Sequence, residues 1–169
     1  MKSSLLFALL FCTVGCSSDP LRGVTPGTGS AVTDADLVRL IKTDPTWTFY
    51  KRSATPIMRS SRPHPDAQAL TRYNTRAATQ LDAAGKVRAG ASFPDSSIIV
   101  KELSNASVIG TYAVMMKLRG SSSAGFDRWI WAEYSPSGTV KYSTTGRGGA
   151  CSDCHSQGID YTRMNDTHP

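Results

Sequence analysis

Five consecutive residues near the end of the chain could carry out specific chemistry: Cys151, Ser152, Asp153, Cys154 and His155. Two thiols separated by two residues, with an imidazole directly after the second, form the pattern by which haem is attached covalently in c-type cytochromes. Each thiol adds to one vinyl group of the porphyrin, and the adjacent imidazole is positioned to bind the iron. The motif therefore predicts one haem c, bound covalently through Cys151 and Cys154, with His155 as the metal ligand.

The same motif has two other readings, a thioredoxin-like redox pair and half of a zinc site. A redox pair usually lies at a helix start near a βαβ pattern, whereas here a glycine-rich segment, residues 144–150, precedes the first cysteine. Zinc needs about four ligands, and His64 and His168 are the remaining histidines. The sequence thus favours haem over both alternatives.

Length and composition bound the architecture. The chain has 169 residues, 40% of them hydrophobic, which predicts one domain with a single core. Its formal net charge of +6 is spread along the chain and is not gathered into a Lys/Arg run. A nucleic-acid partner is therefore not expected. The charge predicts a basic soluble surface, with attraction to an acidic redox partner or anionic lipid as a secondary reading.

The first residues are typical of an exported protein. Residues 1–15 carry Lys2 followed by a short apolar run, as in a signal peptide. The run is too short to span a bilayer as a permanent helix. Residues 13–16 resemble a bacterial lipobox, so Cys16 is predicted to carry a lipid. We therefore expect a protein of the bacterial cell envelope, on the periplasmic side, attached to the membrane through this lipid alone.

The cysteine count fits this organisation. Cys12 leaves with the signal peptide, Cys16 takes the lipid, and the two C-terminal cysteines hold haem, so no thiol remains for a disulfide. Residues 16–32 are rich in proline and glycine and read as a flexible tether. The predicted division is a signal peptide over 1–15, a tether over 16–32 and one haem-binding cytochrome domain over 33–169.

Helical signals precede strand signals along the domain. Thr33 as a cap and apolar residues at helical spacing predict a helix that ends before Pro45. Residues 47–50 either begin a strand or dock this helix on the core, and residues 53–66 are expected to be irregular. Residues 67–84 form either a helix or a strand followed by a helix.

Beyond residue 95 the hydrophobic period changes to two. Strands are predicted over residues 97–103, 109–118, 126–134 and 139–143, with Tyr112, Val114, Met116 and Leu118 on one face of the second. Short connections predict antiparallel pairing. The expected fold class is α+β: a mainly antiparallel sheet with a few helices packed on it and covalently bound haem near the C-terminus.

Lys101 is the most informative residue outside the haem motif. It shares a strand face with Ile99 and Leu103. If those two residues face the core, Lys101 points inward, where an uncompensated charge is costly. The other reading places it on a solvated edge.

Two further groups are candidates for catalysis. Glu133 shares a strand face with Trp129 and Trp131, so it is either a proton acceptor beside the haem or a surface carboxylate. Arg76, close to Arg72, either hydrogen-bonds a haem ligand or propionate or lies on a solvated helix face.

Candidates for a sixth iron ligand are of two kinds, and neither is strongly indicated. His64 lies between two prolines, which suggests an exposed loop, and His168 is the penultimate residue. The methionines considered are Met58, Met115, Met116 and Met164. Methionine in a strand usually fills the core.

Several segments together resemble the cytochrome P-460 family. Residues 93–103 are similar to its Phe-x-Asp-Gly-x-x-x-Val-Lys-Glu strand, the aromatic strand at 129–131 follows, and residues 160–163 trail the haem motif in a similar way. The resemblance covers about residues 45–165. It implies a mainly antiparallel β fold, commonly as a homodimer, and a haem whose only protein ligand is histidine.

The resemblance also implies a choice of function. One branch of the family oxidises hydroxylamine and has a lysine bonded to the haem, and Lys101 matches that lysine. The related cytochromes c′-beta lack this bond and bind nitric oxide or carbon monoxide. We expect a five-coordinate iron that acts on or binds small nitrogen species such as hydroxylamine or nitric oxide, with a redox partner protein. A six-coordinate electron-transfer cytochrome is the alternative.

Overall fold

The computed structural model describes residues 31–43, 46–59 and 64–163. The predicted signal peptide and the lipid site at Cys16 lie outside these residues, as do Pro45, Met164 and His168. In the described part of the chain, no helix has both the length and the apolar character needed to cross a membrane.

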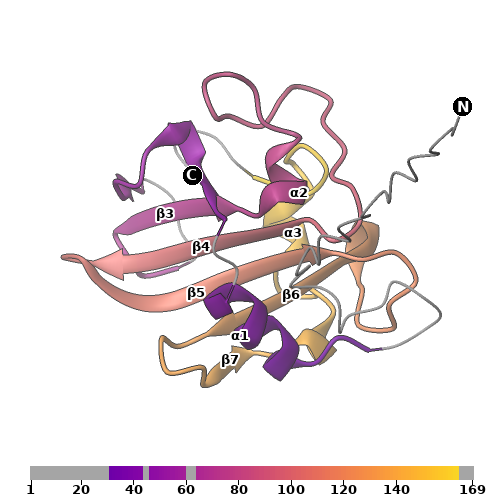
Figure 1. The fold of residues 1–169 in the computed structure, drawn as a ribbon. Helices are drawn as coiled ribbons and strands as arrows, with labels where there is room; N and C mark the ends of the chain where they lie inside the picture. The colour runs from indigo at the N-terminus through magenta and orange to yellow at the C-terminus, as the bar shows by residue number, and fades with distance from the viewer. Residues whose placement is uncertain (1–30, 44–45, 60–63, 164–169) are drawn as a thin grey trace, which may run out of the picture.

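One antiparallel sheet of seven strands forms the centre of the fold (Figure 1). The strands are β1 (Thr48–Phe49), β2 (Ile57–Met58), β3 (Gln68–Tyr73), β4 (Ile98–Asn105), β5 (Val108–Lys117), β6 (Trp129–Tyr134) and β7 (Val140–Tyr142). Their spatial order is β1-β3-β4-β5-β6-β7, and β2 also pairs with β3. Three α-helices lie within the described ranges: α1 (Asp34–Thr43), α2 (Thr75–Ala78) and α3 (Ser152–His155). The mainly antiparallel α+β class is therefore confirmed.

Helix α1 covers one face of the sheet. Thr33 caps it reciprocally: the Asp36 amide donates to Thr33 Oγ1 at 3.2 Å, and the Thr33 amide donates to Asp36 Oδ2 at 3.1 Å. The predicted apolar stripe of α1 is buried against alternate residues of the three central strands. These residues are Leu37, Leu40 and Ile41 from α1 and Val100, Val114, Met116, Ile130, Ala132 and Tyr134 from the sheet.

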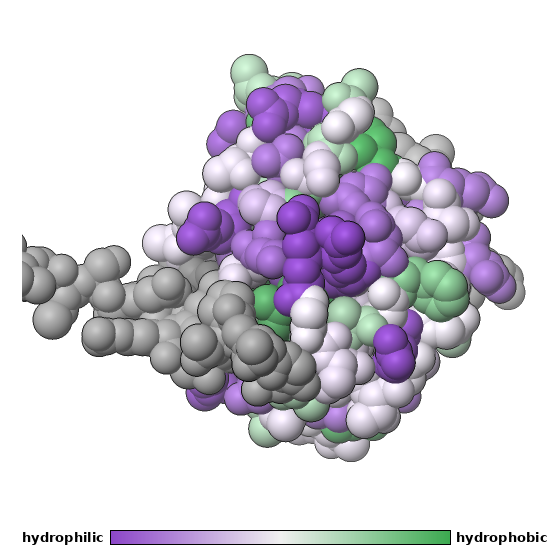
Figure 2. Space-filling view, turned by 90° about the vertical axis from the view of Figure 1, so that its right-hand side faces the viewer, coloured by the Kyte–Doolittle hydropathy of each residue, from purple (hydrophilic) through white to green (hydrophobic). Residues whose placement is uncertain are grey.

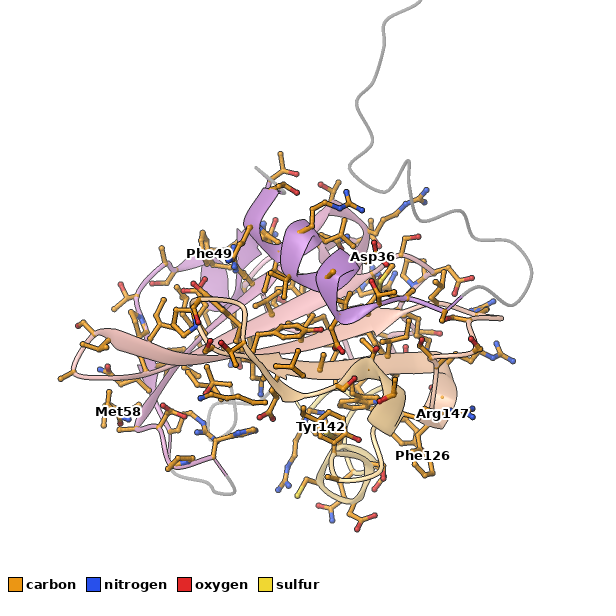
Figure 3. All side chains as sticks on the ribbon, turned by 90° about the horizontal axis from the view of Figure 1, so that it is seen from below. Asp36, Phe49, Met58, Phe126, Tyr142 and Arg147 are labelled. Carbon is orange, nitrogen blue, oxygen red and sulfur yellow. The ribbon has the colours of Figure 1, made fainter. Side chains whose placement is uncertain are left out.

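The opposite face of the sheet has its own apolar cluster. Tyr73, Ile99, Met115, Trp129 and Trp131 form it, because side chains alternate between the two faces along each strand. The cover over this face comes from the loop before β4 and from the C-terminal segment. Figure 3 shows the arrangement from below: α1, with Asp36, lies on one side of the sheet, and Tyr142 lies on the other.

Most predicted elements are confirmed, with differences at their ends. Tyr112, Val114, Met116 and Leu118 do share the α1 face. The segment over 67–84 is a strand followed by a short helix. The helix begins there because the Asn74 carboxamide caps it, accepting from the Ala77 amide at 2.9 Å.

Two predicted boundaries are wrong. The strand expected over 126–134 begins only at Trp129, because residues Phe126–Arg128 form a 3-10 turn in which Asp127 and Arg128 have positive φ angles of 49° and 67°. The segment over 53–66, which was expected to be irregular, contains strand β2, whose two residues pair with β3.

Exposed hydrophobic side chains are scattered over the described surface. On the face shown in Figure 2, hydrophobic residues form small separate spots among hydrophilic ones. The large hydrophobic side chains that are exposed come from four different segments: Met58, Val108, Phe126 and Val140. Single exposed apolar residues of this kind are usual in soluble proteins.

Asp34 ties the start of α1 to the sheet, which gives a first prediction. Its carboxylate accepts hydrogen bonds from the buried Tyr134 hydroxyl (2.9 Å), the Ser143 hydroxyl (2.7 Å) and the Thr144 amide (3.0 Å). We expect Asp34→Ala to lower the free energy of unfolding by about 2–3 kcal/mol, because it leaves these donors without their acceptor. Tyr134→Phe, which removes one donor, should cost about 1 kcal/mol. Urea denaturation measures both, and equal losses would contradict the assignment.

Candidate functional site

A cavity of about 350 Å³ lies on the face of the sheet opposite α1. Strands β4 to β7, Arg59, His64 and the C-terminal segment all contribute to its lining. The lining residues are Arg59, His64, Ile99, Lys101, Leu103, Ala113, Val114, Met115, Trp131, Ala132, Glu133, Lys141, Tyr142, Ala150, Cys151, Cys154 and His155.

Sheet register explains why Lys101 and Glu133 both line this cavity. Lys101 on β4 pairs with Ala113 on β5, and Ala113 pairs with Glu133 on β6. The three residues therefore lie in one row across three adjacent strands, on the same face. Because alanine is the middle member, the row has little side-chain volume at its centre, which leaves space between the lysine and the carboxylate.

Helix α3 turns the three functional groups of the Cys-x-x-Cys-His motif toward the cavity. The His155 amide donates to the Cys151 carbonyl at 3.2 Å, which closes one helical turn. Residues three and four apart lie on the same face of a helix, so Cys151, Cys154 and His155 lie together. All three line the cavity.

The imidazole of His155 is held in one orientation. Its Nδ1 lies 2.9 Å from the Tyr161 carbonyl oxygen, and the ring meets Trp131 edge to face with centroids 4.8 Å apart. A carbonyl only accepts hydrogen bonds, so Nδ1 carries the proton and Nε2 carries the lone pair. Burial, together with the charge of Lys101, lowers the pKa of His155 to about 4. The ring is thus neutral, which is the form that binds metal ions.

Lys101 points into the cavity and not to a solvated edge. It is 7% exposed. Burial, and after it the charges of Arg59 and Arg163, lower its pKa to about 7. Near neutral pH a sizeable fraction of this amine is therefore unprotonated, and an unprotonated amine is a nucleophile.

Glu133 is half-buried in the same cavity. It lies next to His64, which the flanking prolines predicted to be in an exposed loop. His64 Nε2 lies 3.7 Å from Glu133 Oε1, and both side chains are about one quarter exposed, at 25% and 24%. Burial raises the pKa of Glu133 and lowers that of His64. The prolines on either side of His64 gave no hint of this contact.

Other cavity residues were not predicted to be at the site. Lys141 and Tyr142 belong to β7, and the pairing of Glu133 with Tyr142 brings this strand to the cavity. Lys141 and Tyr142 could have been placed at the site if the order of the strands in the sheet had been known. Arg59 lies in a segment without a clear pattern, and its guanidinium donates to the Asp66 carbonyl at 2.9 Å.

Some predicted candidates lie elsewhere. Arg76 is exposed on α2 and does not line the cavity, which agrees with the solvated-face reading. Met58 is 64% exposed, and Met116 is buried on the α1 face. Among the methionines that the structure describes, Met115 lines the cavity.

Comparison with protein families and with curated proteins found no match to this chain. The two alternative readings of the motif therefore have to be weighed on geometry. Over the described ranges, no three His, Cys, Asp or Glu side chains form a cluster that could hold a metal ion, which disfavours a zinc cage. Burial raises the pKa of Cys151 to about 11, unlike the lowered pKa of a reactive redox cysteine.

The residues present fit a haem. The cavity supplies two thiols, one neutral imidazole and an apolar wall that includes Ile99, Leu103, Met115 and Trp131. Arg59 and Lys141 add positive charge suited to carboxylate groups. The indole nitrogen of Trp131 is buried without a hydrogen-bond partner. The volume lies within the range of pockets that bind small molecules, about 300–1,000 Å³.

Gly148, just before the Cys-x-x-Cys-His motif, allows a matched test of the packing around Trp131. Its φ is +76°, and an added Cβ would overlap the Trp131 ring. We expect Gly148→Ala to lower the free energy of unfolding by about 2–4 kcal/mol, because it adds backbone strain to overpacking. Gly149→Ala should be tolerated, since the nearest atom to its Cβ would be the Gly146 carbonyl oxygen at 3.6 Å. Tryptophan fluorescence and urea denaturation measure the pair, and similar losses would show that Trp131 is not closely packed there.

The buried amine of Lys101 predicts a pH-dependent stability of the haem-free chain. Between pH 7 and 10.5 the unfolded chain binds a proton at this lysine and the folded chain does not, so wild-type stability rises with pH through that window. We expect Lys101→Met to be more stable than wild type by about 2–4 kcal/mol at pH 6, with the difference shrinking toward pH 10. Denaturation at several pH values measures this.

Lys141→Met is the control, because it removes a positive charge from an exposed lysine beside the same cavity. A stability difference between Lys101→Met and wild type that stays constant from pH 6 to pH 10 would contradict the burial of a titrating amine.

Proposed function

We propose that this chain is a monohaem c-type cytochrome similar to cytochrome P-460, with haem bound through Cys151 and Cys154 and with His155 as the axial ligand. One observation carries the proposal: a single cavity joins the Cys-x-x-Cys-His motif to Lys101 and Glu133, which come from two different strands. When bound, the haem supplies electron transfer and an iron position open to a small ligand.

The chain's own residues have distinct parts in this proposal. His155 presents a neutral imidazole whose orientation the Tyr161 carbonyl holds. The apolar wall that includes Trp131 and Met115 would keep water away from a haem bound in this cavity. Glu133 is placed to accept a proton from hydroxylamine, because it lines the cavity and burial raises its pKa. His64 is the titratable side chain beside it, with Nε2 3.7 Å from Glu133 Oε1.

This proposal includes two related functions, which differ in whether Lys101 is bonded to the haem. Hydroxylamine oxidation in the P-460 branch goes with a bond between lysine and haem, whereas nitric oxide binding in the c′-beta branch does not need one. Lys101 is buried in the cavity with a pKa of about 7, which favours the first. We further propose that the protein is exported and lipid-anchored at Cys16, passes electrons to a redox partner and forms a homodimer.

An electron-transfer cytochrome is the second candidate. It requires a second protein ligand on the iron. His64 and Met115 are the two candidates for this role among the cavity-lining residues that the structure describes. A low-spin spectrum that becomes high-spin in His64→Ala or Met115→Ala would support this candidate over the first.

Expression in a host able to mature c-type cytochromes tests the proposal. We expect a coloured protein whose pigment survives acid–acetone extraction, and a proteolytic peptide containing Cys151 and Cys154 that carries the mass of haem. Cys151→Ala/Cys154→Ala should lose the covalent pigment, while the matched Ser152→Ala variant should keep it. A colourless wild-type protein, or a pigment that acid–acetone extraction removes, would refute the proposal.

The same digest distinguishes the two branches. If Lys101 is bonded to the haem, its peptide stays with the haem peptide, and Lys101→Arg releases it. An unmodified Lys101 peptide in mature protein would favour nitric oxide binding without hydroxylamine turnover.

A further inference from the structure

A buried lysine lies outside the cavity and has no part in the function proposed above. Lys117, at the end of β5, has a side chain that is 3% exposed. Its Nζ lies 2.6 Å from Asp160 Oδ1 and 3.1 Å from Asp127 Oδ2, and 5.0 Å from the centroid of the Trp129 ring. Removing a charge from water is costly, and an apolar residue of similar size often fills such a position at no loss of stability.

Asp160 is the central member of this cluster. Its other carboxylate oxygen accepts the Phe93 amide at 2.7 Å, and its carbonyl accepts the Trp129 indole N–H at 2.9 Å. Asp160 is therefore held from the end of β5, from the loop before β4 and from the start of β6. These three attachments fix one point of the segment that follows the haem motif.

The next residue, Tyr161, forms the hydrogen bond to the imidazole of His155. The carbonyl of Tyr161 accepts the hydrogen bond from His155 Nδ1 at 2.9 Å. Asp160 and Tyr161 have φ angles of 48° and 60°, in the left-handed region that residues other than glycine avoid by about 1–2 kcal/mol each. The segment does not adopt this shape by its own preference, so outside contacts must impose it.

The segment is also closed on itself. The Thr162 amide and hydroxyl both donate to the Ile159 carbonyl, at 2.8 Å and 2.6 Å. A side chain at Gly158 would overlap the Thr162 carbonyl. This small loop carries the Tyr161 carbonyl, and Asp160 is the residue by which the loop is anchored to the sheet.

We propose that Lys117 is a positioning residue for the imidazole of His155, acting through Asp160 and the Tyr161 carbonyl. The inference rests on the proposed function, in which that imidazole binds the haem iron. A hydrogen bond from the distant ring nitrogen raises the basicity of the ligand and strengthens its bond to the metal. Stronger donation favours the ferric state and lowers the reduction potential, so Lys117 keeps the potential lower than it would otherwise be.

The test compares five variants of the full, haem-loaded chain: Lys117→Met, Lys117→Arg, Asp160→Asn, the double variant Lys117→Met/Asp160→Asn, and Asp127→Asn. Asp127 also contacts Lys117 and interacts with Asp160, but its side chain is 45% exposed and the structure gives it no contact with Tyr161 or His155. Its replacement leaves the contact between Lys117 and Asp160 in place, so it is the comparison variant. The measurements are the iron–histidine stretching frequency of the ferrous protein by resonance Raman and the reduction potential by redox titration.

We expect Lys117→Met and Asp160→Asn each to lower the stretching frequency and to raise the potential. The double variant should resemble the single ones and not show their sum, because both changes act through one contact. Asp127→Asn should stay close to wild type. Lys117→Arg should recover most of the wild-type values, since it restores the charge facing Asp160.

Two results would overturn the inference. The first is a Lys117→Met protein with wild-type haem content, stretching frequency and potential. The second is an Asp127→Asn protein shifted as far as Lys117→Met, which would show a general effect of charge. If Lys117→Met fails to fold, the comparison of Asp160→Asn with Asp127→Asn decides in the same way.

A separate readout keeps this inference distinct from the proposed function. If the wild-type chain carries no covalent haem, the proposed function fails. In that case ¹⁵N-histidine NMR of the haem-free chain still reports the ring. We expect His155 to be protonated at Nδ1 in wild type and to become a mixture of tautomers in Lys117→Met, and an unchanged tautomer would refute the positioning role.

Discussion

The alternation of side chains along β4, β5 and β6 is the constraint on which the rest of the structure depends. These strands carry apolar residues on both faces, so each face has to be covered separately. Helix α1 covers one face with an amphipathic stripe. The other face is covered by segments without long helices, and this irregular cover leaves the cavity that holds the candidate site.

Charged residues on the cavity side of the sheet form two separate groups. Lys101 and Glu133 lie in one row across the sheet and face the cavity, where burial shifts the pKa of each toward neutrality. Lys117 lies on the same face of β5 beyond Ala113, and the carboxylates of Asp127 and Asp160 contact it. Lys101 and Glu133 suit proton transfer, because both face the cavity and burial lowers the pKa of the lysine and raises that of the carboxylate. Lys117 suits a fixed scaffold, because it contacts Asp127 and Asp160 within hydrogen-bond distance.

Much of this was predictable from the sequence, because it depends on local pattern. The period-two strands, the α1 stripe and the Cys-x-x-Cys-His turn are all encoded within short windows. The inward position of Lys101 followed from its neighbours Ile99 and Leu103 once a core face was assumed. Contacts between distant segments were not predictable: His64 reaches Glu133 from a proline-flanked loop, and Arg59 joins the cavity without any signal. For Arg76 the sequence left a haem contact and a solvated helix face as alternatives, and its side chain lies on the exposed side of α2.

The high pKa of Cys151 also bears on how such a protein would be assembled. A thiol that ionises only at about pH 11 is almost entirely protonated at neutral pH, and the thiolate is the reactive form. In the folded chain this sulfur is therefore a poor nucleophile. Under the proposed function, the thioether bonds form most readily before β4–β7 close around the motif, while water still surrounds both sulfurs. Under the same proposal, haem attachment precedes the folding of the sheet against the C-terminal segment, because folding removes water from the Cys151 sulfur.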